Sequence, residues 1–247
     1  YELLVIGEPL VAAHAPSSAN DESGYSRYLI ASLPEVAGAS RLMYVDADMI
    51  VSPTAPAFHE LELGGRIGVV DEWAQPTSER RVEYQLAHGF EASPREYYAL
   101  AGFDVVGDTM VNAGMFVCEP RRHGSWLAEL ARRHAPIGAT HPRGPHYEQA
   151  AFGATLAEDD MAEFLPAHWN RIWPVHRWAS LGTRSSSGPG PATADPRARF
   201  QALRLLRQTL EEPGFVHMTA GVDHDLAAIL NPARSEPTPA APHQAST

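Results

Sequence analysis

The sequence predicts an α/β fold, built as a single domain around a mostly parallel, mixed sheet. Segments with the pattern of strands alternate along the chain with segments of helical period. The length of 247 residues is enough to bury a sizeable core. A pair of aspartates directly follows an apolar strand, where ligands bind in open α/β sheets. We expect the domain to cover residues 1–230, followed by a disordered Pro/Ala-rich tail at residues 231–247.

Short apolar runs predict the strands, and apolar residues that recur every three to four positions predict the helices. The predicted strands cover residues 2–6, 41–45, 66–70, 115–118, 162–165 and 214–218. The predicted helices cover residues 23–33, 55–63, 82–88, 126–134, 147–156 and 197–210. In the first helix Tyr25, Tyr28 and Leu33 share one face, and Pro34 marks its end. Residues 183–196 are rich in Ser, Gly and Pro, which predicts a flexible loop.

Composition excludes several classes of function. The net charge of −11 disfavours a nucleic-acid partner. All 19 basic residues are arginine, which rules out Schiff-base lysines, P-loop lysines and lysine general bases. The lone Cys118 excludes an internal disulfide and a cysteine-rich zinc site. No apolar run reaches the roughly 18 residues of a membrane span, and no signal peptide is visible, so we expect a cytoplasmic protein without an integral membrane segment.

The stretch RLMYVDADMIV at residues 41–51 places two aspartates between two apolar runs. In an extended backbone Asp46 and Asp48 share one face, and Ala47 points to the other. Two carboxylates about 6 Å apart repel by roughly 3 kcal/mol at an effective dielectric constant of 20. Arginine pairing, backbone amides at a turn, or a divalent cation such as Mg²⁺ or Mn²⁺ would offset this repulsion.

Two classes of enzyme place Asp-x-Asp after a strand. In phosphatase-like enzymes the aspartates act as nucleophile and general acid. These enzymes also need a lysine to hold the phosphate and a second acidic pair to bind Mg²⁺. In nucleotide-sugar glycosyltransferases the aspartates hold a cation that bridges the donor diphosphate. This chain lacks lysine, and Met-Ile follows its aspartates in place of a Gly-Thr turn. The second class is therefore favoured, and the phosphatase-like interpretation stays as an alternative.

Five segments in order extend this interpretation. GYSRYLIASLP (24–34) precedes RLMYVDADMIV, and then come TMVNAGMFV (109–117), HYEQAAFG (146–153) with LPAHWN (165–170), and GFVHMTAG (214–221). Together they resemble the retaining glycosyltransferases of family 8, which include glycogenin and bacterial lipopolysaccharide galactosyl- and glucosyltransferases. The resemblance covers most of residues 24–224.

The resemblance implies a Rossmann-like GT-A fold, a UDP-sugar donor, Mn²⁺ or Mg²⁺, and retention at the anomeric carbon. It implies transfer of glucose or galactose to an acceptor that is a sugar, a protein or a small metabolite. Asp46, Asp48 and His217 match the metal ligands. Gln149 matches the residue under the reacting face of the sugar. The positions that match the donor-binding site are Arg27, Ala47, Asn112, Ala113, Gly114, Glu148 and Gly221.

The chain departs from the family pattern at three places. Roughly 40 residues precede the aspartates where the family has about 60, so we expect the first β-α unit to be absent. Val222, Asp223 and His224 follow Gly221, where the family has a phosphate-binding lysine. Glu148 stands where aspartate is usual. The first two departures support an alternative from another class, a non-catalytic GT-A-like domain that binds a nucleotide or scaffolds partners.

Overall fold

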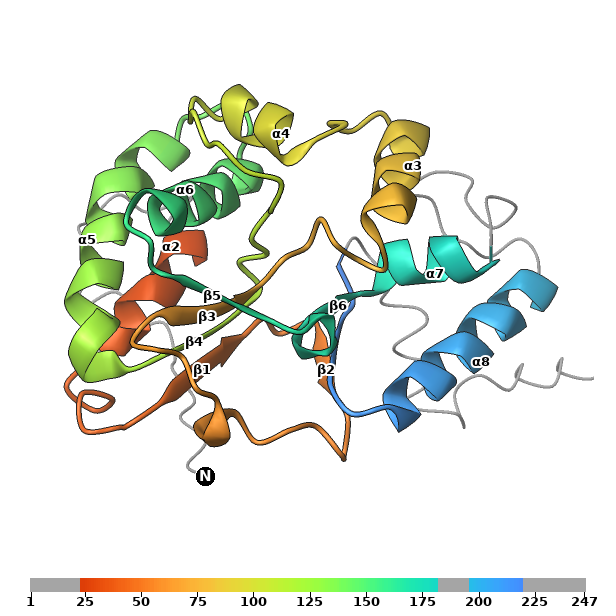
Figure 1. Ribbon diagram of the computed structural model, residues 1–247, viewed down its shortest axis with the longest axis horizontal. Coiled ribbons are helices and arrows are strands. Elements are labelled where there is room, and N and C mark those ends of the chain that lie inside the picture. Colours follow the sequence, from red (N-terminus) through yellow and green to blue (C-terminus); the bar gives the residue numbers. More distant parts are fainter. Residues whose placement is uncertain (1–22, 182–195, 220–247) are drawn as a thin grey trace, which may run out of the picture.

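The structure, a computed structural model, describes residues 23–181 and 196–219 (Figure 1). The predicted strand at residues 2–6 and the predicted tail at residues 231–247 lie outside these ranges. Nearly all of the predicted loop at residues 183–196 also lies outside them, as does Gly221.

The strands form two sheets. The first has the order β1-β4-β3-β5, with β1 at Leu42–Val45, β4 at Met115–Cys118, β3 at Ile67–Val70 and β5 at Ala162–Leu165. The second has the order β2-β7-β6, with β2 at Met49–Val51, β7 at Phe215–His217 and β6 at Arg171–Ile172. Among the described strands, β3 with β5 and β6 with β7 are parallel, and the other three pairings are antiparallel. The α/β class with a mixed sheet is therefore confirmed, but the mostly parallel arrangement is wrong.

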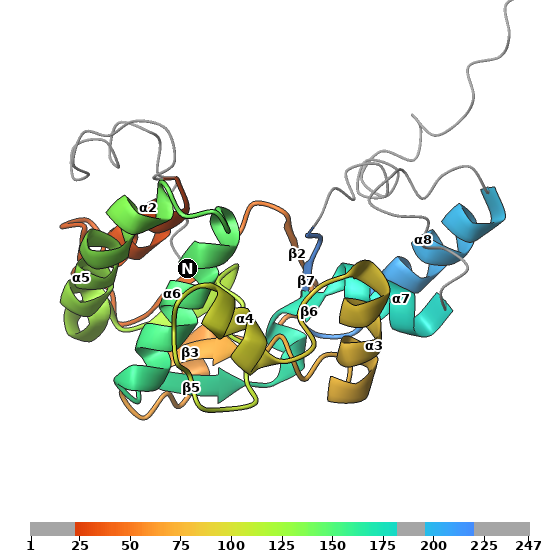
Figure 2. The same cartoon turned by 90° about the horizontal axis from the view of Figure 1, so that it is seen from above.

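Helices gather on two sides of this framework. They are α2 (Ser23–Leu29), α3 (Ser78–His88), α4 (Pro94–Leu100), α5 (Pro120–Gly138), α6 (Pro145–Glu158), α7 (Trp173–Leu181) and α8 (Pro196–Glu211). Figures 1 and 2 show α2, α5 and α6 beside the first sheet, and α3, α7 and α8 beside the second. None of the helices in the described ranges is long and apolar enough to cross a membrane.

The main core lies between the first sheet and the helices α2, α5 and α6. Tyr28 of α2, Phe116 of β4 and Phe152 of α6 are fully buried and contact one another. The ring centroids of Tyr28 and Phe152 are 4.9 Å apart, and those of Tyr28 and Phe116 are 5.9 Å apart. Aromatic pairs at such distances add about 0.5–1.5 kcal/mol beyond the burial of their area. This core therefore fixes α2 and α6, both of which carry predicted site residues.

Tryptophans pack the remaining interior. Trp169 stacks on Phe215 of β7, with the ring centroids 5.3 Å apart. Trp173 is fully buried among residues of α8 and β7, and Trp178 is 7% exposed. Burial of this extent favours core packing over a platform for an acceptor sugar.

Several elements differ from the sequence prediction. The predicted helix at residues 55–63 is only a short 3₁₀ turn, Phe58–Glu60. The apolar strand β1 is only half-buried, because among the described residues it pairs with β4 on one edge alone. The helix α4 was not predicted, although Ser93 caps its start and Pro94 occupies its first turn. The two-residue strand β6 and the helix α7 after it were also missed.

Candidate metal and donor site

The aspartate pair lies in a tight turn that joins the two sheets. β1 ends at Val45 and β2 begins at Met49, whose N–H donates to the Asp46 carbonyl at 3.1 Å. The N–H of Asp46 donates to the Gly114 carbonyl at 2.8 Å, which fixes the start of the turn beside β4. The extended backbone assumed from the sequence is therefore wrong for these residues. The turn still places both carboxylates at the carboxyl end of β1, as the pattern predicts.

β7 brings His217 to the two aspartates. His217 pairs in register with Met49, and its Nε2 lies 3.1 Å from Asp48 Oδ1 and 3.7 Å from Asp46 Oδ2. One ligand atom from each of Asp46, Asp48 and His217 lies within 4.8 Å of the others. The close contact with His217 lowers the pKa of Asp48, so this carboxyl stays ionised at neutral pH. Carboxylate oxygens with one imidazole nitrogen suit a divalent cation such as Mn²⁺ or Mg²⁺.

Arg27 of α2 supplies a positive charge beside Asp46. Its Nη1 lies 3.1 Å from Asp46 Oδ1, and the Tyr44 hydroxyl donates to the same oxygen at 2.5 Å. Arg27 also donates to the carbonyls of Gly24 and Ala113 at 2.8 and 2.9 Å. Arginine pairing therefore offsets the charge of Asp46, while Asp48 faces His217 with its side chain 48% exposed.

Two predicted residues at the start of α6 line the same region. Glu148 accepts a hydrogen bond from the Tyr28 hydroxyl and lies 3.8 Å from Arg27 Nε. Burial raises the pKa of Glu148 to about 7, although Arg27 and the Tyr28 hydroxyl oppose the rise. Gln149 accepts from the Ala113 N–H at 3.3 Å.

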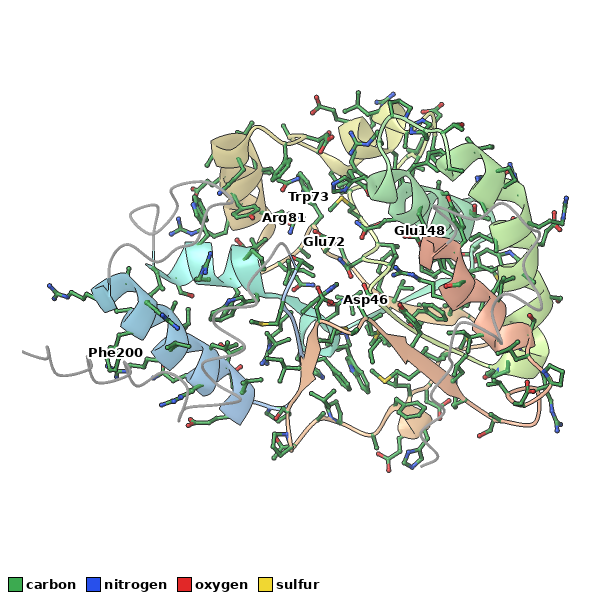
Figure 3. The ribbon with its side chains drawn as sticks, turned by 180° about the vertical axis from the view of Figure 1, so that it is seen from behind. Asp46, Glu72, Trp73, Arg81, Glu148 and Phe200 are labelled. Carbon is green, nitrogen blue, oxygen red and sulfur yellow. The ribbon has the colours of Figure 1, made fainter. Side chains whose placement is uncertain are left out.

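A buried carboxylate that the sequence prediction missed lies behind these residues. Glu72 follows β3 and pairs with Arg81 of α3, and Gln149 Nε2 donates to its Oε2 at 3.2 Å. Burial opposes ionisation of Glu72, but Arg81 and the Asn112 amide lower its pKa below the usual value. Figure 3 shows Glu72 and Arg81 on the side of α3, and Glu148 on the side of α2. The signal in the sequence was its position, because Glu72 closely follows the predicted strand at residues 66–70 as Asp46 follows that at residues 41–45. In the structure β1 and β3 both run antiparallel to β4, so both end at the same edge.

The predicted donor-binding residues of the VNAGM segment are also close. Asn112 is buried, Ala113 supplies the carbonyl that binds Arg27, and Gly114 contacts His217. Ala47 is exposed in the turn between the aspartates. The structure thus brings together every predicted site residue that it describes.

Gly114→Ala should disturb the candidate metal site directly. A Cβ at this position would lie 2.2 Å from His217 Cε1 and 2.8 Å from its Nδ1, closer than real Cβ atoms approach. We expect Mn²⁺ binding, measured by electron paramagnetic resonance, to weaken by about 10–100-fold, as for loss of a ligand-orienting contact. Gly107→Ala is the control, because a Cβ there meets nothing within 4 Å. Equal Mn²⁺ affinity in the two variants would show that His217 is not a ligand.

Comparisons with known proteins bear on the fold. No protein-family model matches the sequence, and a search of curated proteins finds no match. Among solved structures, the chain is similar to the apo structure of the bifunctional glycosyltransferase WbbM, with a TM-score of 0.50 and 15% identity over 84% of this chain and 33% of that chain.

Two further structures are similar at lower scores. The galactosyltransferase LgtC, in complex with donor and acceptor sugar analogs, gives a TM-score of 0.46 and 14% identity over 85% of this chain and 64% of that one. Mouse xyloside xylosyltransferase 1, in its apo form, gives 0.38 and 14% over 79% and 63%. The chain thus spans about a third of the WbbM chain and less than two thirds of the other two. Together with the mixed sheets and helices described above, the likeness to WbbM identifies the architecture as a GT-A fold.

Proposed function

We propose that this chain is a retaining glycosyltransferase of the family 8 type. It moves glucose or galactose from a UDP-sugar to an acceptor, using Mn²⁺ or Mg²⁺ held by Asp46, Asp48 and His217. The observation that carries the proposal is the convergence of the Asp-x-Asp turn and His217, with ligand atoms within 4.8 Å of one another. The two aspartates lie in the turn between β1 of the first sheet and β2 of the second, and His217 lies on β7 of the second sheet.

The electrostatics of the site fit an anionic diphosphate. Asp46, Asp48 and His217 would hold the cation, and its positive charge would offset the negative charge that grows on the leaving diphosphate. Arg27 lies next to Asp46 with its side chain 16% exposed, and adds a fixed positive charge on the same side. Asp48, with its side chain half exposed, marks the face from which the donor enters.

Gln149 is held with a defined orientation. Its amide nitrogen donates to Glu72, and its oxygen accepts from the Ala113 N–H. An amide is too weak a base to act as an enzymic nucleophile, so we propose that Gln149 supports the sugar. Attack then occurs from the face of the departing phosphate, which accounts for retention.

A second candidate function is a non-catalytic domain that binds the nucleotide and metal. It is favoured by one observation: the polar groups expected to contact the donor sugar already bond within the protein. Arg27 contacts Asp46 and the Ala113 carbonyl. Glu148 accepts a hydrogen bond from the Tyr28 hydroxyl. The Gln149 amide is hydrogen-bonded through both its nitrogen and its oxygen. Sugar binding at these positions would have to replace those contacts.

A thermal-shift assay with UDP, with and without Mn²⁺, tests the proposed site. Ligand at 100 times its dissociation constant adds about 2.7 kcal/mol, which in a domain of this size raises Tm by roughly 5–10 °C. We expect this rise only when UDP and Mn²⁺ are both present. Release of UDP from UDP-glucose or UDP-galactose then separates an enzyme from a binding domain. If neither UDP nor UDP with Mn²⁺ changes Tm, both the enzyme and the nucleotide-binding domain are contradicted.

A further inference from the structure

Four buried polar side chains form a continuous hydrogen-bonded row behind the candidate metal site. The row runs from Glu72 through Asn112 and Asn170 to His217, and these residues are 8%, 4%, 0% and 4% exposed. Water does not compete for buried groups of this kind, so each donor must face an acceptor. The direction of every hydrogen bond in the row can therefore be worked out from its ends.

Asn112 is oriented from two sides. The Gly114 N–H, which can only donate, lies 2.9 Å from Asn112 Oδ1. The Glu72 carboxylate, which can only accept while ionised, lies 2.8 Å from Asn112 Nδ2. Flipping the amide would place two donors together at one end and two acceptors together at the other. The Asn112 oxygen therefore faces away from Glu72.

The orientation of Asn112 fixes that of Asn170. Asn112 Oδ1 accepts a second hydrogen bond from Asn170 Nδ2 at 2.8 Å. The Asn170 oxygen then faces His217 Nδ1 at 3.2 Å. An amide oxygen only accepts, so Nδ1 of His217 must carry a proton. In a neutral imidazole this leaves the lone pair on Nε2, which is the atom that faces Asp46 and Asp48.

We propose that Glu72, Asn112 and Asn170 are positioning residues that hold the proton of the neutral His217 ring on Nδ1 and keep Nε2 available to bind a divalent cation. Without the row, a proton on Nε2 would be favoured, because Asp48 Oδ1 lies 3.1 Å away and would accept it. The role of the cation rests on the proposed function, but the protonation of the ring does not.

This role differs from the one that the resemblance implies for Asn112. The resemblance assigns its side chain to the hydroxyls of the donor sugar. Here the Asn112 oxygen already accepts from Gly114 and Asn170, and its amide donates to Glu72. We assign Asn112 to the orientation of His217 rather than to the sugar.

The ring proton can be located in the unaltered protein. Nitrogen-15 NMR of the protein labelled at its 12 histidines, at a pH where the rings are neutral, separates Nδ1–H from Nε2–H forms. Comparison with His217→Gln identifies the signals of His217. We expect the Nδ1–H form without metal, and an Nε2–H form would overturn the proposal.

Asn170→Leu removes the last member of the row at similar volume. We expect the His217 ring to shift toward the Nε2–H form, and Mn²⁺ to bind about 10–100-fold more weakly. Thr155→Val is the control: it also removes a buried side-chain hydrogen bond, from the Thr155 hydroxyl to the Ala151 carbonyl at 2.8 Å, but this bond lies on α6 and outside the row. The ring signals of His217 and the Mn²⁺ affinity should match those of the unaltered protein, while the signals of His134, which lies 3.5 Å from the Thr155 hydroxyl, can change. An Asn170→Leu protein with unchanged ring protonation would refute the positioning role.

The two readouts separate this inference from the proposed function. If the unaltered protein binds no Mn²⁺ but its His217 ring is in the Nδ1–H form, the metal-dependent function is contradicted and the positioning role of the row is supported. If Mn²⁺ binds tightly but His217 of the metal-free protein carries its proton on Nε2, the metal-dependent function is still supported. The positioning role of the row is then refuted. If Asn170→Leu does not fold, the measurement on the unaltered protein alone decides.

Discussion

Asp48→Asn is expected to abolish metal-dependent turnover while leaving the fold intact. The side chain of Asp48 is 48% exposed, so its replacement should change the stability of the metal-free protein little. The cation would contribute several kcal/mol to stabilisation of the leaving diphosphate, and about 4 kcal/mol corresponds to roughly 1,000-fold in rate. We therefore expect release of UDP from the donor to fall by about 1,000-fold or more.

Asp46 is a less informative target than Asp48. It also pairs with Arg27 and accepts from the Tyr44 hydroxyl, so Asp46→Asn mixes a loss of metal with a loss of structure. Asp108→Asn is the control for Asp48→Asn, because it makes the same change of charge at an exposed position. Its UDP release and its Tm shift with UDP and Mn²⁺ should equal those of the unaltered protein. Turnover by Asp48→Asn at the unaltered rate would exclude Asp48 from the metal site.

The sequence was most informative where a chemical pattern coincided with the end of a strand. The predicted strands at residues 115–118 and 162–165 match β4 and β5, and that at residues 66–70 matches β3 to within one residue. The site followed from the same signal, because Asp46 directly follows β1 and His217 is the last residue of β7. Side chains at strand ends are brought together by the sheet whatever the loops between them do.

Strand direction and turn geometry could not be predicted in this way. An apolar run has the same pattern whether its neighbour is parallel or antiparallel, so the reversed direction of β4 was not visible. The aspartates were placed in an extended segment, since nothing in Asp-Ala-Asp marks the turn that passes the chain to the second sheet. Glu72 was missed as a member of the site because its importance depends on Asn112, a partner 40 residues away in sequence.

Breaking the buried ion pair between Glu72 and Arg81 should cause the largest loss of stability of any single change considered. Arg81 is 4% exposed, and its Nε and Nη1 have no hydrogen-bond partner in the described structure. Glu72→Gln leaves this guanidinium without its counter-charge, which typically costs 3–5 kcal/mol. For a chain of this size we expect Tm to fall by roughly 6–20 °C. Arg81→Met should be similarly destabilised, because it leaves the buried Glu72 carboxylate without its counter-charge.

The same helix provides a matched control for this prediction. Arg80 pairs with Glu83 at 2.8 Å, but both side chains are more than half exposed. An exposed pair of this type contributes about 0.3–0.5 kcal/mol, so Arg80→Met should shift Tm by no more than 1–2 °C. The double variant Glu72→Gln with Arg81→Met should recover part of the stability that each single variant loses, because both charges are removed and no buried charge is left without a partner. Equal effects of Arg80→Met and Arg81→Met on Tm would mean that Glu72 and Arg81 are solvated in solution. The row that orients His217 would then have no fixed acceptor at its far end.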